Sequence, residues 1–136
     1  MSNLRLPLSV AVLAVAACLT LACGVSSPPQ HMLTSITLSP TSANGQVQFV
    51  ATGTYTTAPV TVTPLTATWG ACYQFQPTTA VTVSSTGLAQ CASGASGTFF
   101  VWANDPIDAP GTYSCPAENA CGGGCVVQGN ALLTCP

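Results

Sequence analysis

The sequence predicts an all-β protein, a sandwich of six or seven short strands, and three observations support this fold class. From Thr34 onward, apolar residues alternate with Thr, Ser and Gln, which is the pattern of half-buried strands. Turn-forming residues recur about every ten positions, a spacing typical of all-β sandwiches. Val and Thr, which favour strands, are common, and no helical pattern is visible between residues 34 and 104.

Each expected strand is marked by alternating residues and by a break that ends it. Ser39-Pro40 ends the first strand, and Asn44-Gly45 forms a turn before the second. Pro59 and Pro64 bound the third strand, and the turn Ser84–Gly87 separates two later ones. The expected strand regions, in order, are 34–38, 47–55, 60–62, 65–69, 81–83, 88–91 and 98–103.

Charge is almost absent from the chain. The one Lys or Arg is Arg5, the one histidine is His31, and the acids are Asp105, Asp108 and Glu118. Because contacts to phosphates depend on Lys and Arg, a role with nucleic acid is excluded. An anionic membrane surface would not attract the chain either. Hydroxyls and amides must keep the surface hydrated, which suits a protein tethered in place.

Residues 1–22 have the layout of a secretory signal peptide. A basic start, Met1 to Arg5, precedes an apolar stretch from Leu6 to Ala22, with small residues before Cys23. The alternative is an uncleaved membrane helix. That stretch contains Pro7 and is marginal in length for crossing a bilayer, so cleavage is the expected fate.

The segment Leu19-Thr20-Leu21-Ala22-Cys23 resembles the lipobox of bacterial lipoproteins, although that family usually has Leu at the position of Thr20. A competing match places Cys18 after Val15-Ala16-Ala17. The number of cysteines favours Cys23, because the signal then removes Cys18 and the lipid occupies Cys23. Six of the eight cysteines remain, an even number suited to disulfides.

This resemblance implies diacylglycerol on the thiol of Cys23 and cleavage before it. Two or more acyl chains anchor a protein to a membrane stably. Gly24 is not the Asp that typically retains such proteins at the inner membrane, so the implied location is the outer membrane or cell surface. Residues 23–33 are then a tether rich in Ser and Pro, in which His31 is expected to be a solvated linker residue.

Four pieces between residues 34 and 104 carry a second resemblance. They are Ser35-Ile36-Thr37-Leu38-Ser39-Pro40, Ala67-Thr68-Trp69, the run from Ala80 to Ala89, and Gly97-Thr98. In this order they resemble the group 2 bacterial Ig-like domain, a module of invasin- and intimin-type adhesins. The resemblance implies an immunoglobulin-like β-sandwich of about seven strands with a structural or adhesive role at the cell surface. The segment Gly70–Phe75 departs from the Ser/Asn-rich turn that the family has after the Trp.

Residues 105–136 lie beyond this resemblance and are expected to be a cysteine-rich C-terminal extension. Disulfides are the usual supplement to the small core of an exported domain. Many pairings are compatible with the sequence. We expect a bond between Cys72 and Cys91, both at strand ends, and two bonds within the extension. The six cysteines expected in disulfides are Cys72, Cys91, Cys115, Cys121, Cys125 and Cys135.

A zinc site in the extension is the alternative use of its four cysteines. Structural zinc sites usually contain two pairs of ligands, each separated by two to four residues. Only Cys121 and Cys125 have that spacing, and no histidine is near them. Disulfides are therefore expected, and no metal or cofactor.

Catalytic groups are scarce, and the chain is not expected to be an enzyme. His31 lies in the tether, away from any cysteine it could activate. Asp105 and Asp108 flank a turn and are expected to cap it. The alternative is a weak calcium site with Asn104, but calcium usually takes six or more oxygen ligands. Glu118 lies between cysteines without a visible partner.

The aromatic residues offer the one candidate ligand surface. On the last expected strand, Phe99 and alternate residues after it share one face, while Phe100 and Trp102 share the other. If one face is core, the other is either covered by the extension or exposed to a partner protein or a sugar. Tyr73 and Phe75 are a second candidate surface. A carbohydrate- or peptide-binding lipoprotein is accordingly the alternative to a purely structural or adhesive module.

Overall fold

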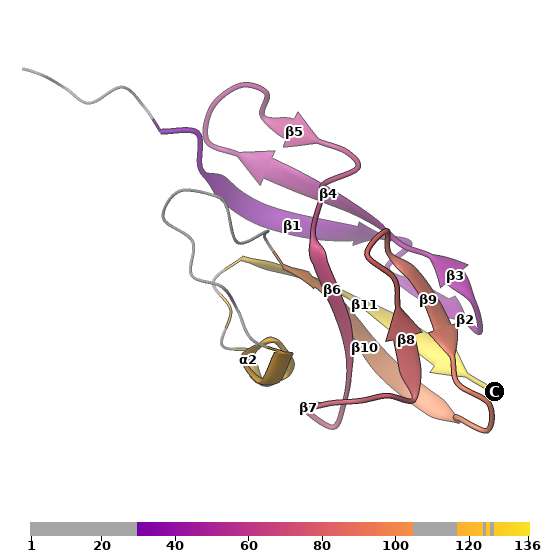
Figure 1. Ribbon diagram of the computed structural model, residues 1–136. Helices are drawn as coiled ribbons and strands as arrows, with labels where there is room; N and C mark the ends of the chain where they lie inside the picture. Colours follow the sequence, from indigo (N-terminus) through magenta and orange to yellow (C-terminus); the bar gives the residue numbers. More distant parts are fainter. Residues whose placement is uncertain (1–29, 105–116, 124, 126) are drawn as a thin grey trace, which may run out of the picture.

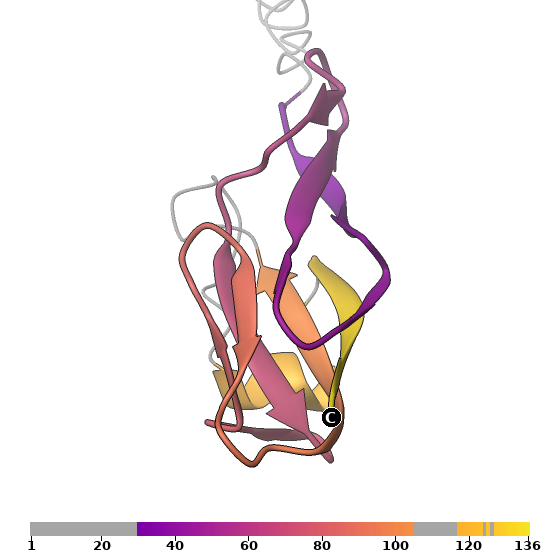
Figure 2. The ribbon, with the colours of Figure 1, turned by 90° about the vertical axis from the view of Figure 1, so that its right-hand side faces the viewer.

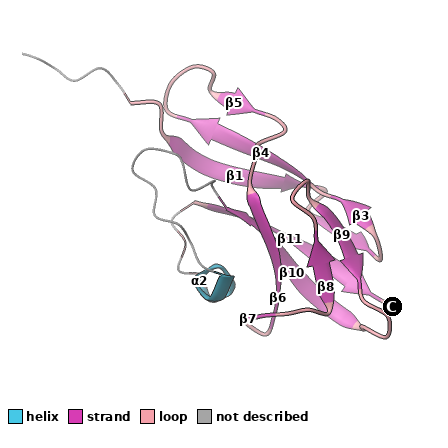
Figure 3. Cartoon of the chain, in the orientation of Figure 1, coloured by secondary structure: helices cyan, strands magenta, loops and turns pink. Residues whose placement is uncertain are grey.

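The structure is a computed structural model that describes residues 30–104, 117–123, 125 and 127–136. These residues form an all-β sandwich with one short helix (Figures 1 and 3). The predicted signal peptide, Cys23, and the predicted turn at Asp105 and Asp108 lie outside the described residues. The predicted all-β sandwich is confirmed.

Most of the elements are short strands, as the frequent Pro and Gly breaks indicate. In chain order they are β1 (Leu33–Ser39), β2 (Ser42–Asn44), β3 (Val47–Gln48), β4 (Val50–Tyr55), β5 (Thr61–Val62), β6 (Thr68–Tyr73), β7 (Gln76–Pro77), β8 (Val81–Val83), β9 (Leu88–Cys91), β10 (Gly97–Asn104), the helix α2 (Ala117–Gly122) and β11 (Gln128–Cys135).

Three sheets make up the two layers of the sandwich. One layer is the five-stranded sheet β2-β11-β10-β6-β7, and the other contains the sheets β1-β4-β5 and β3-β9-β8 (Figure 1). The main core lies between the layers and takes residues from every sheet, including Leu38, Phe49, Ala89 and Leu133. In the view turned by 90°, the β4–β5 hairpin lies at one end of the domain and β7 at the other (Figure 2).

The alternation in the sequence corresponds to burial in the structure. In β1, Ile36 and Leu38 are buried while Thr37 between them is exposed, and Leu33 is also buried because the register shifts between Leu33 and Ser35. In β10, Phe99 and Val101 point into the core. This agreement follows from strand geometry, because successive side chains point to opposite faces of a sheet.

The last strand of the sandwich comes from the C-terminal extension. β11 pairs antiparallel with β10 along its whole length, from Gly97↔Cys135 to Asn104↔Gln128, and pairs in parallel with β2. Ala131 and Leu133 of β11 are buried in the main core. This strand is not among those expected from the sequence, although the alternation of Ala131, Leu133 and Cys135 with polar or exposed neighbours is a period-two signal.

The predicted bond between Cys72 and Cys91 is wrong, and so is the prediction that the cysteines of the extension bond only to one another. The structure joins Cys72 to Cys121 and Cys91 to Cys135, with Cα–Cα distances of 5.5 and 5.8 Å. The reason is that Cys72 lies with Cys121 on the outer face of the five-stranded sheet, whereas Cys91 packs against the main core. Cys125 is also disulfide-bonded, and Cys115 lies outside the described residues.

Candidate functional site

The outer face of the five-stranded sheet is the surface that the sequence singled out through Phe100 and Trp102. The two residues do share this face, but their environments differ sharply. The Phe100 side chain is 47% exposed, whereas that of Trp102 is 4% exposed. The proposed platform of two exposed aromatic rings is therefore not present.

Trp102 is buried because the C-terminal residues cover it. Its indole lies against Gly70 of the neighbouring strand β6, where a Cβ atom would overlap the ring. On its other side it forms a small buried cluster with Ala120 and Cys121 of α2. The expectation that the extension folds back over this face thus applies to Trp102, but Phe100 remains exposed.

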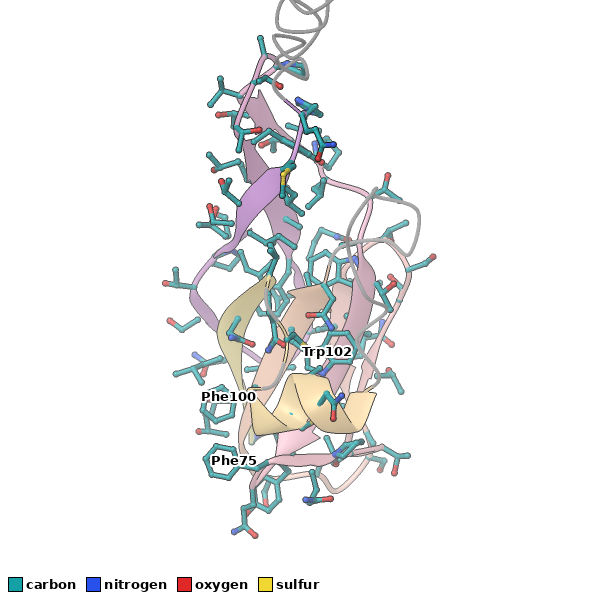
Figure 4. The ribbon with its side chains drawn as sticks, turned by 90° about the vertical axis from the view of Figure 1, so that its left-hand side faces the viewer. Phe75, Phe100 and Trp102 are labelled. Atoms are coloured by element: carbon teal, nitrogen blue, oxygen red, sulfur yellow. A yellow bond between two sulfur atoms is a disulfide. The ribbon has the colours of Figure 1, made fainter. Side chains whose placement is uncertain are left out.

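Three exposed apolar side chains lie on or beside the remaining outer face, and we call them the outer patch: Phe75, Phe100 and Leu132. Their exposed fractions are 70%, 47% and 38%. Phe100 is paired across the sheet with Leu132 on one side and with Cys72 on the other. Figure 4 shows Phe75 and Phe100 near each other on the same side of the domain, beside α2.

Phe75 reaches this surface through an unusual turn. It follows Gln74 in the two-residue connection between β6 and β7, which closes on the pair Tyr73↔Gln76. Gln74 and Phe75 have φ values of 50° and 64°, in the left-handed region where Asn and Gly are preferred. Backbone strain of this kind persists only where the surroundings enforce it. Here Tyr73 packs on Phe99 with ring centroids 5.2 Å apart, which fixes the start of the turn.

A groove with a volume of about 180 Å³ lies between Phe75, Phe100 and the end of α2. The disulfide between Cys72 and Cys121 contributes to its lining, as do the amide side chains of Gln128 and Asn130. No ionisable side chain is among these lining residues, since both cysteines are oxidised. The groove is accordingly neutral and combines aromatic with amide groups.

The two amides form an ordered pair. Nε2 of Gln128 donates to Oδ1 of Asn130 at 2.6 Å and to the backbone oxygen of Ala120 at 3.1 Å. This arrangement uses both hydrogens of the Gln128 amide and turns the carbonyl of Asn130 toward Gln128. The NH2 group of the exposed Asn130 side chain is then directed away from Gln128, with two hydrogens to donate.

His31 is more ordered than a solvated linker residue. Its ring stacks on that of Tyr55, with centroids 4.2 Å apart and an interplanar angle of 6°. Its Nδ1 is also 3.0 Å from Oγ1 of Thr57. The oxygen of Gln30 accepts a hydrogen bond from Thr56, and the N–H of Met32 donates to the same hydroxyl. These contacts fix residues 30–32, the end of the predicted tether, against the β4–β5 hairpin.

The other candidate residues contribute little to a site in the described part of the chain. Asn104, the third residue of the calcium alternative, is buried and its amide contacts the sulfur of Cys125 at 3.6 Å. The side chain of Glu118 lies outside the described residues. Cys121, Cys125 and Cys135 are disulfide-bonded, and the described residues contain no group of three or more metal-ligating side chains.

Among the described residues, no helix has the length and hydrophobicity needed to cross a bilayer. In comparisons with protein-family models and with curated proteins, the sequence gives no match. The class that the structure itself defines is a disulfide-linked all-β sandwich with a neutral, partly aromatic groove on one face.

Proposed function

We propose that this protein is an exported, lipid-anchored module of the bacterial cell surface, Ig-like in fold, with a structural or adhesive role and no catalytic activity. Cys23 is the proposed anchor, and the outer membrane or cell surface the proposed location. The outer patch is the surface through which such a module would touch a partner.

The position of the outer patch relative to the start of the described chain carries this proposal. Residues 30–32 are bound to the end of β4, at one end of the domain. The turn bearing Phe75 lies at the opposite end (Figures 1 and 4). An anchor preceding Gln30 would therefore leave the turn that bears Phe75 at the end of the domain far from the membrane, where a surface partner is accessible.

The chemistry of the described residues supports an exported and non-catalytic protein. Disulfides that connect distant elements persist in oxidising compartments and are rare in the cytosol. His31 is near the hydroxyl of Thr57, but its ring stacks on Tyr55, and no carboxylate side chain belongs to the described part of the chain to orient it. A nucleophile without an oriented base is poorly activated.

Lipidation can be tested with two matched cysteine variants of the full-length protein. We expect the wild-type protein in the membrane fraction, with an intact mass equal to a start at Cys23 plus acyl chains. Cys23→Ser should lose the acyl mass, whereas Cys18→Ser should retain it, because Cys18 leaves with the signal peptide. Digestion of whole cells with an added protease should degrade the wild-type protein if it is displayed at the surface. A full-length mass without acyl chains, or loss of lipid in Cys18→Ser alone, would show that Cys23 is not the anchor.

A further inference from the structure

The outer patch is the unexplained apolar surface of this domain. Phe75, Phe100 and Leu132 are exposed on or beside one face. Of the other exposed large apolar residues, Met32 and Val60 are hydrogen-bonded to the end of β4, and Tyr73 packs on Phe99. Clustered apolar exposure in a soluble domain commonly marks a binding surface. We infer that the groove between Phe75, Phe100 and Asn130 binds a sugar ring of a neutral glycan. This inference rests on the proposed function, because it names the ligand of the surface that the anchor would present.

An extended peptide is a poor fit to this groove. Peptides that bind β-proteins as an added strand need the unpaired backbone groups of a sheet edge. Phe100 lies in β10, which is hydrogen-bonded to β6 on one side and to β11 on the other. β11 is itself covered by β2 at Leu132. The backbone beneath Phe100 and Leu132 is therefore already paired, and only side chains are available to a ligand there.

The absence of charge among the described residues that line the groove selects against ionic ligands. None of the residues that line it carries a charge, so a phosphate, sulfate or carboxylate group would lose hydration without gaining an ionic partner. A neutral ligand does not lose the hydration of a charged group when it binds. Hydroxyl groups can exchange water for the exposed NH2 group of Asn130 at little net cost in free energy.

The aromatic and amide groups of the groove match the apolar face and the polar rim of a pyranose ring. Such a ring has apolar C–H faces and a rim of hydroxyl groups. Phe100 and Phe75 offer aromatic surface for the C–H face, and the Asn130 NH2 group, oriented by Gln128, can donate to a hydroxyl oxygen. The volume of about 180 Å³ is below the roughly 300–1,000 Å³ of pockets for drug-sized ligands, and is compatible with one ring seated in an open groove.

The test uses the full-length, oxidised protein in detergent and an array of oligosaccharides. The array contains neutral gluco-, galacto-, manno- and xylo-oligosaccharides beside sialylated and sulfated ones. We expect binding to members of the neutral set. Phe100→Ala and Asn130→Ala should each weaken it by about tenfold or more, the effect expected when a binding anchor is truncated. Val60→Ala, which shortens an equally exposed apolar residue near the tether, should leave affinity unchanged. Thermal unfolding of each variant checks that the fold is intact.

Three results would overturn the inference: no binding to any neutral oligosaccharide, binding only to acidic ones, or binding to neutral ones that neither groove variant weakens.

Analytical ultracentrifugation tests the competing occupant, a second copy of the chain. A dimer of the wild-type protein that Phe100→Ser dissociates would assign the outer patch to self-association. Because lipidation and surface display are measured separately on the wild-type protein, a failed glycan experiment with an intact anchor would remove this inference and leave the proposed function standing.

Discussion

Cys72 of β6 is bonded to Cys121 of α2, and this bond holds the short helix against the outer face of the five-stranded sheet, directly over Trp102. The helix has only six residues and would be unstable by itself. Its position, and the burial of the indole beneath it, therefore depend on contacts that the disulfide maintains. The same bond contributes to the lining of the neutral groove.

Removal of this bond should expose Trp102. In the double variant Cys72→Ala/Cys121→Ala we expect a red shift of tryptophan emission and a loss of up to about 4 kcal/mol in the free energy of unfolding, as the chain-entropy model gives for a loop of this length. The 49-residue separation of the two cysteines sets that loop. Fluorescence and urea unfolding measure both effects.

The matched control is Cys91→Ala/Cys135→Ala, which removes a bond of similar separation on the other side of the molecule. It should lower stability by a comparable amount without moving the emission of Trp102. Unchanged tryptophan emission in Cys72→Ala/Cys121→Ala would mean that α2 stays in place without its disulfide.

Two neighbouring leucines of β11 test whether the C-terminal strand is part of the core. Leu133 is 0% exposed and packs in the main core, whereas Leu132 points to the outer face. Leu133→Ala should lower the free energy of unfolding by about 2–5 kcal/mol, because it leaves a cavity. Leu132→Ala should change it by less than about 1 kcal/mol. Equal and small effects in chemical denaturation would show that β11 is not integrated into the sandwich.

Alanine substitutions at two glycines with positive φ distinguish the cost of backbone strain from the cost of a steric clash. Gly87 and Gly94 have φ values of 87° and 78°. A Cβ at Gly87 would lie 2.5 Å from the backbone oxygen of Phe49 and 2.8 Å from the ring of Trp69, whereas at Gly94 nothing lies within 4 Å. Gly94→Ala should therefore lower the free energy of unfolding by about 1 kcal/mol, because of its positive φ alone.

Gly87→Ala should lower the free energy of unfolding by the same amount for its positive φ. Overpacking against Phe49 and Trp69 should lower it by about 1–3 kcal/mol more. Melting temperatures of the two variants provide the comparison. If both fall equally, the contact between Gly87 and Trp69 is not a tight one.

Local patterns in the sequence predicted many of the strand regions and which residues share a face, but not β2, β7 or β11, and the strand expected at 65–69 lies at Thr68–Tyr73. Phe99 and Val101 share one face and Phe100 lies on the other, as alternation requires, and the structure shows that the face of Phe99 is the core. The predicted regions at 81–83 and 88–91 coincide with β8 and β9. Such predictions succeed because the period of two is a property of the extended backbone and needs no knowledge of what lies opposite.

Contacts between distant segments could not be derived in this way. Alternation indicated that Phe100 and Trp102 share a face, but only the folded chain shows that α2 covers one ring and leaves the other exposed. Likewise, the separate partners of Cys72 and Cys91 depend on which layer of the sandwich each occupies. The sequence by itself determined strand pattern and charge, because these are properties of neighbouring residues. Tertiary structure decided the disulfides, the C-terminal strand and the groove, because each requires segments far apart in the chain to meet.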